Sequence, residues 1–111
     1  MLYDHEQLMD RLEGDRDLVR EVVGVYIREV QANLGRLEDA IRARHVDEIM
    51  RMAHGMKGSS RTVTAESMAT LAEQLETAVK EQRSLGEQAA LLSRLKAEFV
   101  LVRSILETKV A

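Results

Sequence analysis

Apolar residues recur at steps of three or four along most of this chain, and that spacing limits what the chain can fold into. The clearest stripe comprises Val19, Val23, Tyr26, Val30, Leu34, Leu37 and Ile41. A stripe of this kind covers one side of an α-helix and packs against a core. The 111 residues include no Pro and only six Gly, so few residues oppose helix formation. We therefore predict an all-α protein.

Capping signals and helix length place the first two boundaries. Asp4 opens a short helix that Gly14 ends, and Asp15 caps the next helix. Without a later break, residues 16–63 would form one helix of about 70 Å, which is too long for a compact domain of this size. We place a turn at 44–46, although neither Gly nor Pro marks it.

Two further turns complete the helical order. Thr64 or Ala65 marks the end of the third helix, and the fourth helix ends near Arg83. Ser84 and Glu87 form a capping box for the last helix. Long amphipathic helices joined by short turns pack most simply as an antiparallel up-down four-helix bundle, with the short N-terminal helix over one end. We expect one domain spanning residues 1–111.

Composition excludes several kinds of function. The chain has no Cys, which removes disulfides and thiolate metal sites, and no apolar run long enough to cross a membrane. A net charge of -3 and an aromatic content of 3% argue against nucleic acid as a partner. There is no phosphate-binding Gly-rich loop, and the His spacing does not suit a metal. We expect a cytoplasmic protein with no cofactor, no metal and no ATP site of its own.

The most informative residues lie in the third helix. Its buried seam contains Ala53 and Met56, and His54 points about 100° away from Ala53 into solvent. Lys57 and Gly58 follow one turn later on the same side. A nitrogen nucleophile, a cation for phosphoryl oxygens and open space for a partner suit covalent phosphoryl carriage. Each residue also has a simpler interpretation: His54 as an ordinary surface His, Lys57 as a solvated Lys, and Gly58 as a weak point in the helix.

Hairpin geometry brings Glu76 to the same place. His54 lies eleven residues before Ala65 and Glu76 eleven residues after it, so an antiparallel hairpin puts both at one height. A carboxylate there would accept a hydrogen bond from one imidazole N–H and leave the other nitrogen free. A surface Glu without a role is the alternative.

The pattern Ala-His-x-x-Lys-Gly-Ser-Ser at 53–60, with Leu-Ala at 71–72 and Leu-Glu at 75–76, resembles the His-containing phosphotransfer (HPt) domain of two-component phosphorelays. The likeness extends from about Leu12 to Leu106. It implies that His54 is the phosphoacceptor and that Glu76 orients its ring. It also implies response-regulator receiver domains and hybrid or sensor histidine kinases as partners, with magnesium on the receiver.

The resemblance further implies a docking face on the second and third helices around His54. We assign partner contacts to Met50, Arg51, Ser59 and Arg61. Thr64 departs from the pattern, because the family commonly has Gly at this position. Since Thr is able to cap a helix, we predict an altered turn with Thr64 as N-cap rather than lost function.

Two other functions stay open. One is a regulatory module that binds receivers without carrying phosphate. The other is a structural or dimerising helical bundle, which an apolar patch far from His54 and a stable dimer would favour. We expect a monomer. The sequence fixes neither the partners nor the direction of phosphate flow.

Overall fold

The computed structural model describes residues 2–111, and within that range all regular structure is helical. The prediction of an all-α protein is therefore confirmed. The helices are α1 (His5–Arg11), α2 (Arg16–Arg42), α3 (Val46–Thr62), α4 (Glu66–Lys80) and α5 (Leu85–Val110).

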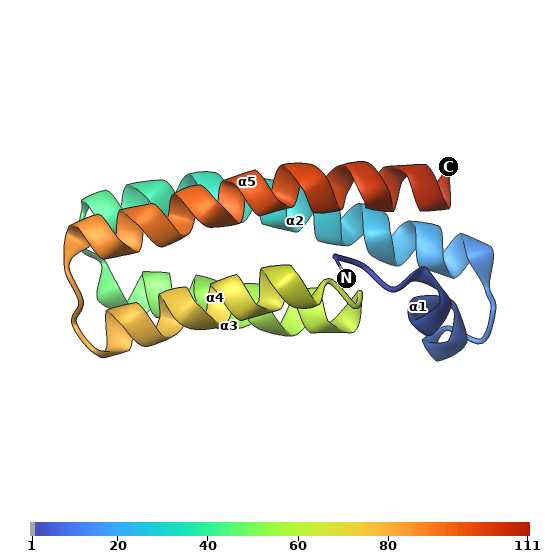
Figure 1. Ribbon diagram of the computed structural model, residues 1–111, viewed down its shortest axis with the longest axis horizontal. Coiled ribbons are helices and arrows are strands. Elements are labelled where there is room, and N and C mark those ends of the chain that lie inside the picture. The colour runs from blue at the N-terminus through green and yellow to red at the C-terminus, as the bar shows by residue number, and fades with distance from the viewer. Residues whose placement is uncertain (1) are drawn as a thin grey trace.

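The four long helices form an up-down bundle of 43 × 21 × 19 Å, as Figure 1 shows. The helix pairs in extensive contact are α2–α3, α3–α4, α4–α5 and α2–α5. Each long helix therefore packs against two neighbours, and α3 lies diagonally across the bundle from α5. Among the described residues, no helix is both long and apolar enough to cross a membrane.

Unequal helix lengths explain the position of α1. Helices α2 and α5 contain 27 and 26 residues, whereas α3 and α4 contain 17 and 15. At 1.5 Å per residue, the first pair is about 15 Å longer than the second. Helix α1 lies in the space under the extended ends of α2 and α5 (Figure 1), where Tyr3 and Leu8 are buried. The short helix therefore covers one end of the bundle, as predicted.

The core is formed by the predicted stripes. All seven residues of the stripe on α2 are buried, and so are Ile49, Ala53 and Met56 on α3. The phenol of Tyr26 also meets the buried hydroxyl of Ser60 on α3 at 2.7 Å. Burial raises the pKa of Tyr26 to about 12. This hydrogen bond therefore joins two neutral side chains and fixes α2 against α3.

Three of the predicted N-caps are present. Asp4, Asp15 and Ser84 each accept a hydrogen bond from the backbone N–H three residues later. The turn between α2 and α3 lies where the helix-length argument placed it, with Arg44 in the left-handed region at φ 59. Helix α4 ends at Lys80, somewhat before the predicted boundary.

The prediction that Thr64 caps α4 is wrong. Ala65 occupies the N-cap position and provides no side-chain hydrogen bond. Thr64 has a left-handed backbone, with φ 65, and its side chain turns toward the N-terminal segment. The Thr64 hydroxyl accepts from the Asp4 backbone N–H at 2.9 Å and donates to the Asp4 carbonyl oxygen at 2.9 Å. Thr64 is 2% exposed, so these hydrogen bonds are shielded from water.

Arg11 makes a second connection between α1 and the end of α3. Its guanidinium donates to the carbonyl oxygen of Arg61 at 2.8 Å and to that of Thr62 at 3.3 Å. The last carbonyls of an α-helix have no partner within the helix. The Arg61 carbonyl oxygen also accepts from the Thr64 N–H, so Arg11 adds a second bond there and supplies a partner for the Thr62 carbonyl oxygen. The N-terminal segment therefore holds the α3–α4 turn through the Asp4 backbone and the Arg11 side chain.

We predict that Thr64→Val lowers the free energy of unfolding by about 1–3 kcal/mol, because the Asp4 N–H loses its partner and the Asp4 carbonyl oxygen keeps only its bond from the Leu8 N–H. Thr64→Gly should cost less, since Gly relieves left-handed strain of roughly 1 kcal/mol while losing the same hydrogen bonds. Urea denaturation measures both. Thr62→Val is the matched control, because Thr62 is exposed and its hydroxyl bonds only within its own helix. A Thr64→Val protein as stable as the wild type would contradict this account.

Candidate functional site

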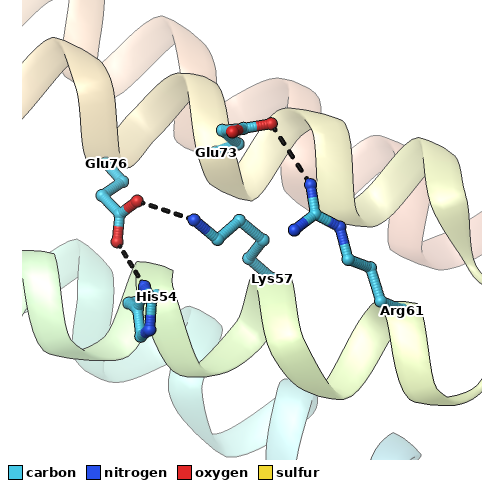
Figure 2. Close-up of polar contacts among 5 residues, drawn as sticks. All are labelled: His54, Lys57, Arg61, Glu73 and Glu76. Atoms are coloured by element: carbon cyan, nitrogen blue, oxygen red, sulfur yellow. Dashed lines mark hydrogen bonds and ion pairs between the residues drawn. The ribbon is translucent and has the colours of Figure 1, made fainter.

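His54 projects from the flank of α3 that faces α4, as Figure 2 shows. Its neighbours Ala53 and Met56 are almost fully buried, whereas 71% of the His54 side chain is exposed. Its ring nitrogen Nδ1 lies 2.8 Å from Glu76 Oε2. The hairpin therefore places Glu76 at the height of His54, as the spacing about Ala65 predicted.

Glu76 is shared between two partners. Its second oxygen, Oε1, accepts a hydrogen bond from Lys57 Nζ at 3.0 Å (Figure 2). The side chains of Lys57 and Glu76 are only 15% and 19% exposed, so this ion pair is largely sheltered. The Lys57 ammonium holds the pKa of Glu76 below its usual value, and His54 acts in the same direction against the opposing effect of desolvation. Glu76 is therefore a carboxylate at neutral pH.

The ionised state of Glu76 determines the tautomer of His54. A carboxylate only accepts hydrogen bonds, so Nδ1 has to carry the proton that joins it to Glu76. In the neutral ring Nε2 then has a free lone pair. The side chain that carries this nitrogen is 71% exposed, and Glu76 contacts it through Nδ1. The arrangement therefore makes Nε2 the nucleophilic nitrogen of the neutral form of the ring.

The cations near His54 differ from the expectation. The sequence suggested that Lys57 is available to phosphoryl oxygens, but its ammonium is engaged by Glu76. Arg51 lies three residues before His54 on α3 and is exposed. Within residues 2–111, no hydrogen bond or ion pair engages its guanidinium. Arg51 is therefore the more accessible cation beside the ring.

The two glycines near His54 face open space. Apart from its chain neighbours and the nearby backbone of α3, a Cβ atom built on Gly55 or Gly58 would meet no atom within 4 Å. Packing inside the chain therefore does not require Gly at either position. Gly58 lies one turn after His54, and the missing side chain leaves the approach to the ring unobstructed on that side.

The other predicted contact residues are dispersed. Ser59 donates to the Met56 carbonyl oxygen at 3.2 Å and lines a hollow between α3 and α2. Its hydroxyl is therefore outside the group formed by His54, Lys57 and Glu76, which we call the His54 cluster. Arg61 pairs with Glu73 at 3.4 Å. Met50 is partly buried against the core. The structure thus brings Lys57 and Glu76 to His54, leaves Arg51 nearby and separates Ser59 and Arg61 from the ring.

The pairing of Lys57 with Glu76 was missed by the sequence reasoning. The signal for it was present, because Lys57 lies closer than His54 to the buried seam of α3 and so faces α4 more directly.

No group of three metal-ligating side chains occurs anywhere in the part of the chain that the structure describes.

Comparisons with known proteins agree with this geometry. The family model described as the Hpt domain matches residues 21–105, a range that contains every residue of the His54 cluster. Histidine-containing phosphotransfer protein B (HptB) from Pseudomonas aeruginosa PAO1 superimposes with a TM-score of 0.89. The two are 22% identical, and the alignment covers 98% of this chain and 94% of that one, which shows a shared fold. A search of curated proteins finds no significant match.

The matched range is well over half of the chain and includes the helices that position the imidazole. The chain therefore belongs to the Hpt domain family, whose members carry phosphoryl groups between histidine kinases and receiver domains in phosphorelay signalling.

Proposed function

We propose that this chain accepts a phosphoryl group on Nε2 of His54 from the aspartyl phosphate of a receiver domain and passes it to another receiver. Direct phosphorylation by a histidine kinase is a second route to the same nitrogen. The observation that carries the proposal is the exposed His54 ring, whose Nδ1 is held 2.8 Å from the Glu76 carboxylate. The other ring nitrogen is thereby left as the nucleophile.

The transfer balances without a separate base. The Nε2 lone pair attacks phosphorus, the P–N bond forms, and the P–O bond to the receiver's Asp breaks with its electron pair leaving on the carboxylate. Because Nε2 carries no proton at the start, none has to be removed. The phosphorylated ring gains positive charge, which the Glu76 carboxylate offsets through Nδ1–H. The reverse sequence passes the group on.

The remaining roles follow from position. Lys57 keeps Glu76 ionised and oriented, Arg51 is available to phosphoryl oxygens or to an acidic partner, and Gly58 admits the partner's surface. Magnesium and most of the catalysis belong to the receiver in this proposal. We further propose that residues 1–111 act as one cytoplasmic, monomeric domain without an ATP site.

We predict that a receiver domain phosphorylated with acetyl phosphate labels the wild-type chain on His54, because the ring is exposed and Glu76 contacts it through Nδ1 rather than Nε2. Mass spectrometry of the peptide detects this acid-labile label. His54→Gln should abolish it. His45→Gln is the matched control, since 65% of the His45 side chain is exposed but it has no Lys-Gly neighbourhood.

The same variant separates the carrier from a receiver-binding module without phosphotransfer. A carrier loses signalling output with His54→Gln, whereas a binding module keeps it. A wild-type chain that binds receivers yet is never labelled would overturn the proposal.

We predict that Glu76→Ala slows transfer about 10–100-fold, as for other groups that orient an imidazole. The ¹⁵N NMR shifts of His54 should show a loss of the Nδ1–H tautomer, which a merely structural role of Glu76 would not alter. Lys57→Met should also slow transfer, but by less than Glu76→Ala, because the Glu76 carboxylate is still present beside the ring. Glu73→Ala is the control, since Glu73 pairs with Arg61 instead. An unchanged tautomer in Glu76→Ala would exclude the orienting role.

One observation favours the alternative of a dimerising bundle. Val100 and Leu101 on α5 are 67% and 54% exposed, and α5 lies diagonally across the bundle from α3. We predict that sedimentation equilibrium at tens of micromolar nevertheless finds a monomer, because two exposed apolar side chains offer too little area for a stable dimer. A dimer that Leu101→Lys dissociates would support the alternative instead.

A further inference from the structure

The α2–α3 turn and the α4–α5 turn lie at the same end of the bundle, on the left of Figure 1. Residues of both turns line a hollow, which we call the end groove. It has a volume of about 570 Å³. Its apolar lining comes from the start of α3, the end of α4 and the start of α5. The residues are Val46, Ile49, Met50, Val79 and Leu85. Val46 and Leu85 are 48% and 40% exposed, which is unusual for aliphatic side chains that line one hollow.

The charged residues that line the end groove are all basic. They are Arg44, Lys80 and Arg83, whereas the whole chain has a net charge of -3. Glu81 neutralises Arg83 through a 2.8 Å ion pair. Arg44 and Lys80 have no ion-pair partner among residues 2–111. The end groove therefore combines apolar side chains with two unneutralised cations in an otherwise acidic molecule.

The end groove adjoins the phosphoacceptor. Met50 lies one helical turn before His54 on α3, and Lys80 lies one turn after Glu76 on α4, so each is about 6 Å along its helix from the site. The same two helices thus form the site and one wall of the groove. A partner large enough to bring an aspartyl phosphate to His54 would extend over this region.

We propose that the end groove is a contact surface for the receiver domain, and that it binds an acidic segment of the receiver that also carries an apolar side chain. This inference rests on the proposed function. The cations select acidic partners and speed association, and the apolar lining receives the anchoring side chain. The groove is separate from the α2–α3 face and adds a means of choosing among receivers that present similar aspartyl phosphates to His54.

The test uses the double variant Arg44→Glu/Lys80→Glu. The control is Arg94→Glu/Lys109→Glu, which makes the same change in net charge at two exposed positions on α5. The donor is the receiver that labels the wild-type chain, phosphorylated with acetyl phosphate and used at a concentration well below saturation. We expect transfer to the groove variant to be roughly 10-fold slower, with a weaker dependence on salt. The control should stay within about 2-fold of the wild type.

Two further measurements separate docking from chemistry. Labelling of His54 by phosphoramidate, a small donor that needs no docking surface, should be equal in all variants. Val46→Ser should slow transfer from the receiver roughly 3-fold, because it removes an exposed apolar group from the groove without changing charge.

Each outcome has one meaning. If no receiver labels the wild-type chain, the proposed function fails and this inference fails with it. If the wild type is labelled and the groove variant equals the control, the inference fails while the function stands. Slower labelling of the groove variant by phosphoramidate as well would place the defect in His54 itself and would also overturn the inference.

Discussion

The packing of α3 against α4 fixes the side chains of the site. Glu76 reaches His54 and Lys57 only because the α3–α4 hairpin sets the two helices in one register. That register depends on the turn between them, which Thr64 and Arg11 tie to the N-terminal segment. A small displacement of α4 along α3 would move the carboxylate away from the ring and leave both tautomers of His54 accessible.

Much of this arrangement could be predicted from the sequence, because it depends on periodicity and counting. The apolar stripe correctly predicted which face of α2 is buried. Equal spacing about Ala65 correctly predicted that Glu76 lies beside His54. Three caps followed from residue type at the helix starts. These features are local, or they follow from a single hairpin, so the pattern is sufficient to locate them.

The features that escaped prediction depend on side-chain directions between elements far apart in sequence. Thr64 was expected to cap α4, but its hydroxyl meets the backbone of Asp4, sixty residues away. Lys57 was expected to be free, yet it lies nearer than His54 to α4 and is drawn to Glu76. Such choices depend on which acceptor is within reach after the helices have packed, and spacing along one helix does not contain that information.

The diagonal placement of α3 and α5 separates two surfaces that would otherwise compete. His54 projects from the flank of α3 that faces α4, while the exposed Val100 and Leu101 belong to α5, the helix across the bundle from α3. A partner that covers the ring and the end groove would meet α5 at its first turn, about 22 Å along the helix from Val100. The fold therefore permits simultaneous occupancy, so that a neighbouring helix or domain resting on α5 has no steric reason to interrupt the relay.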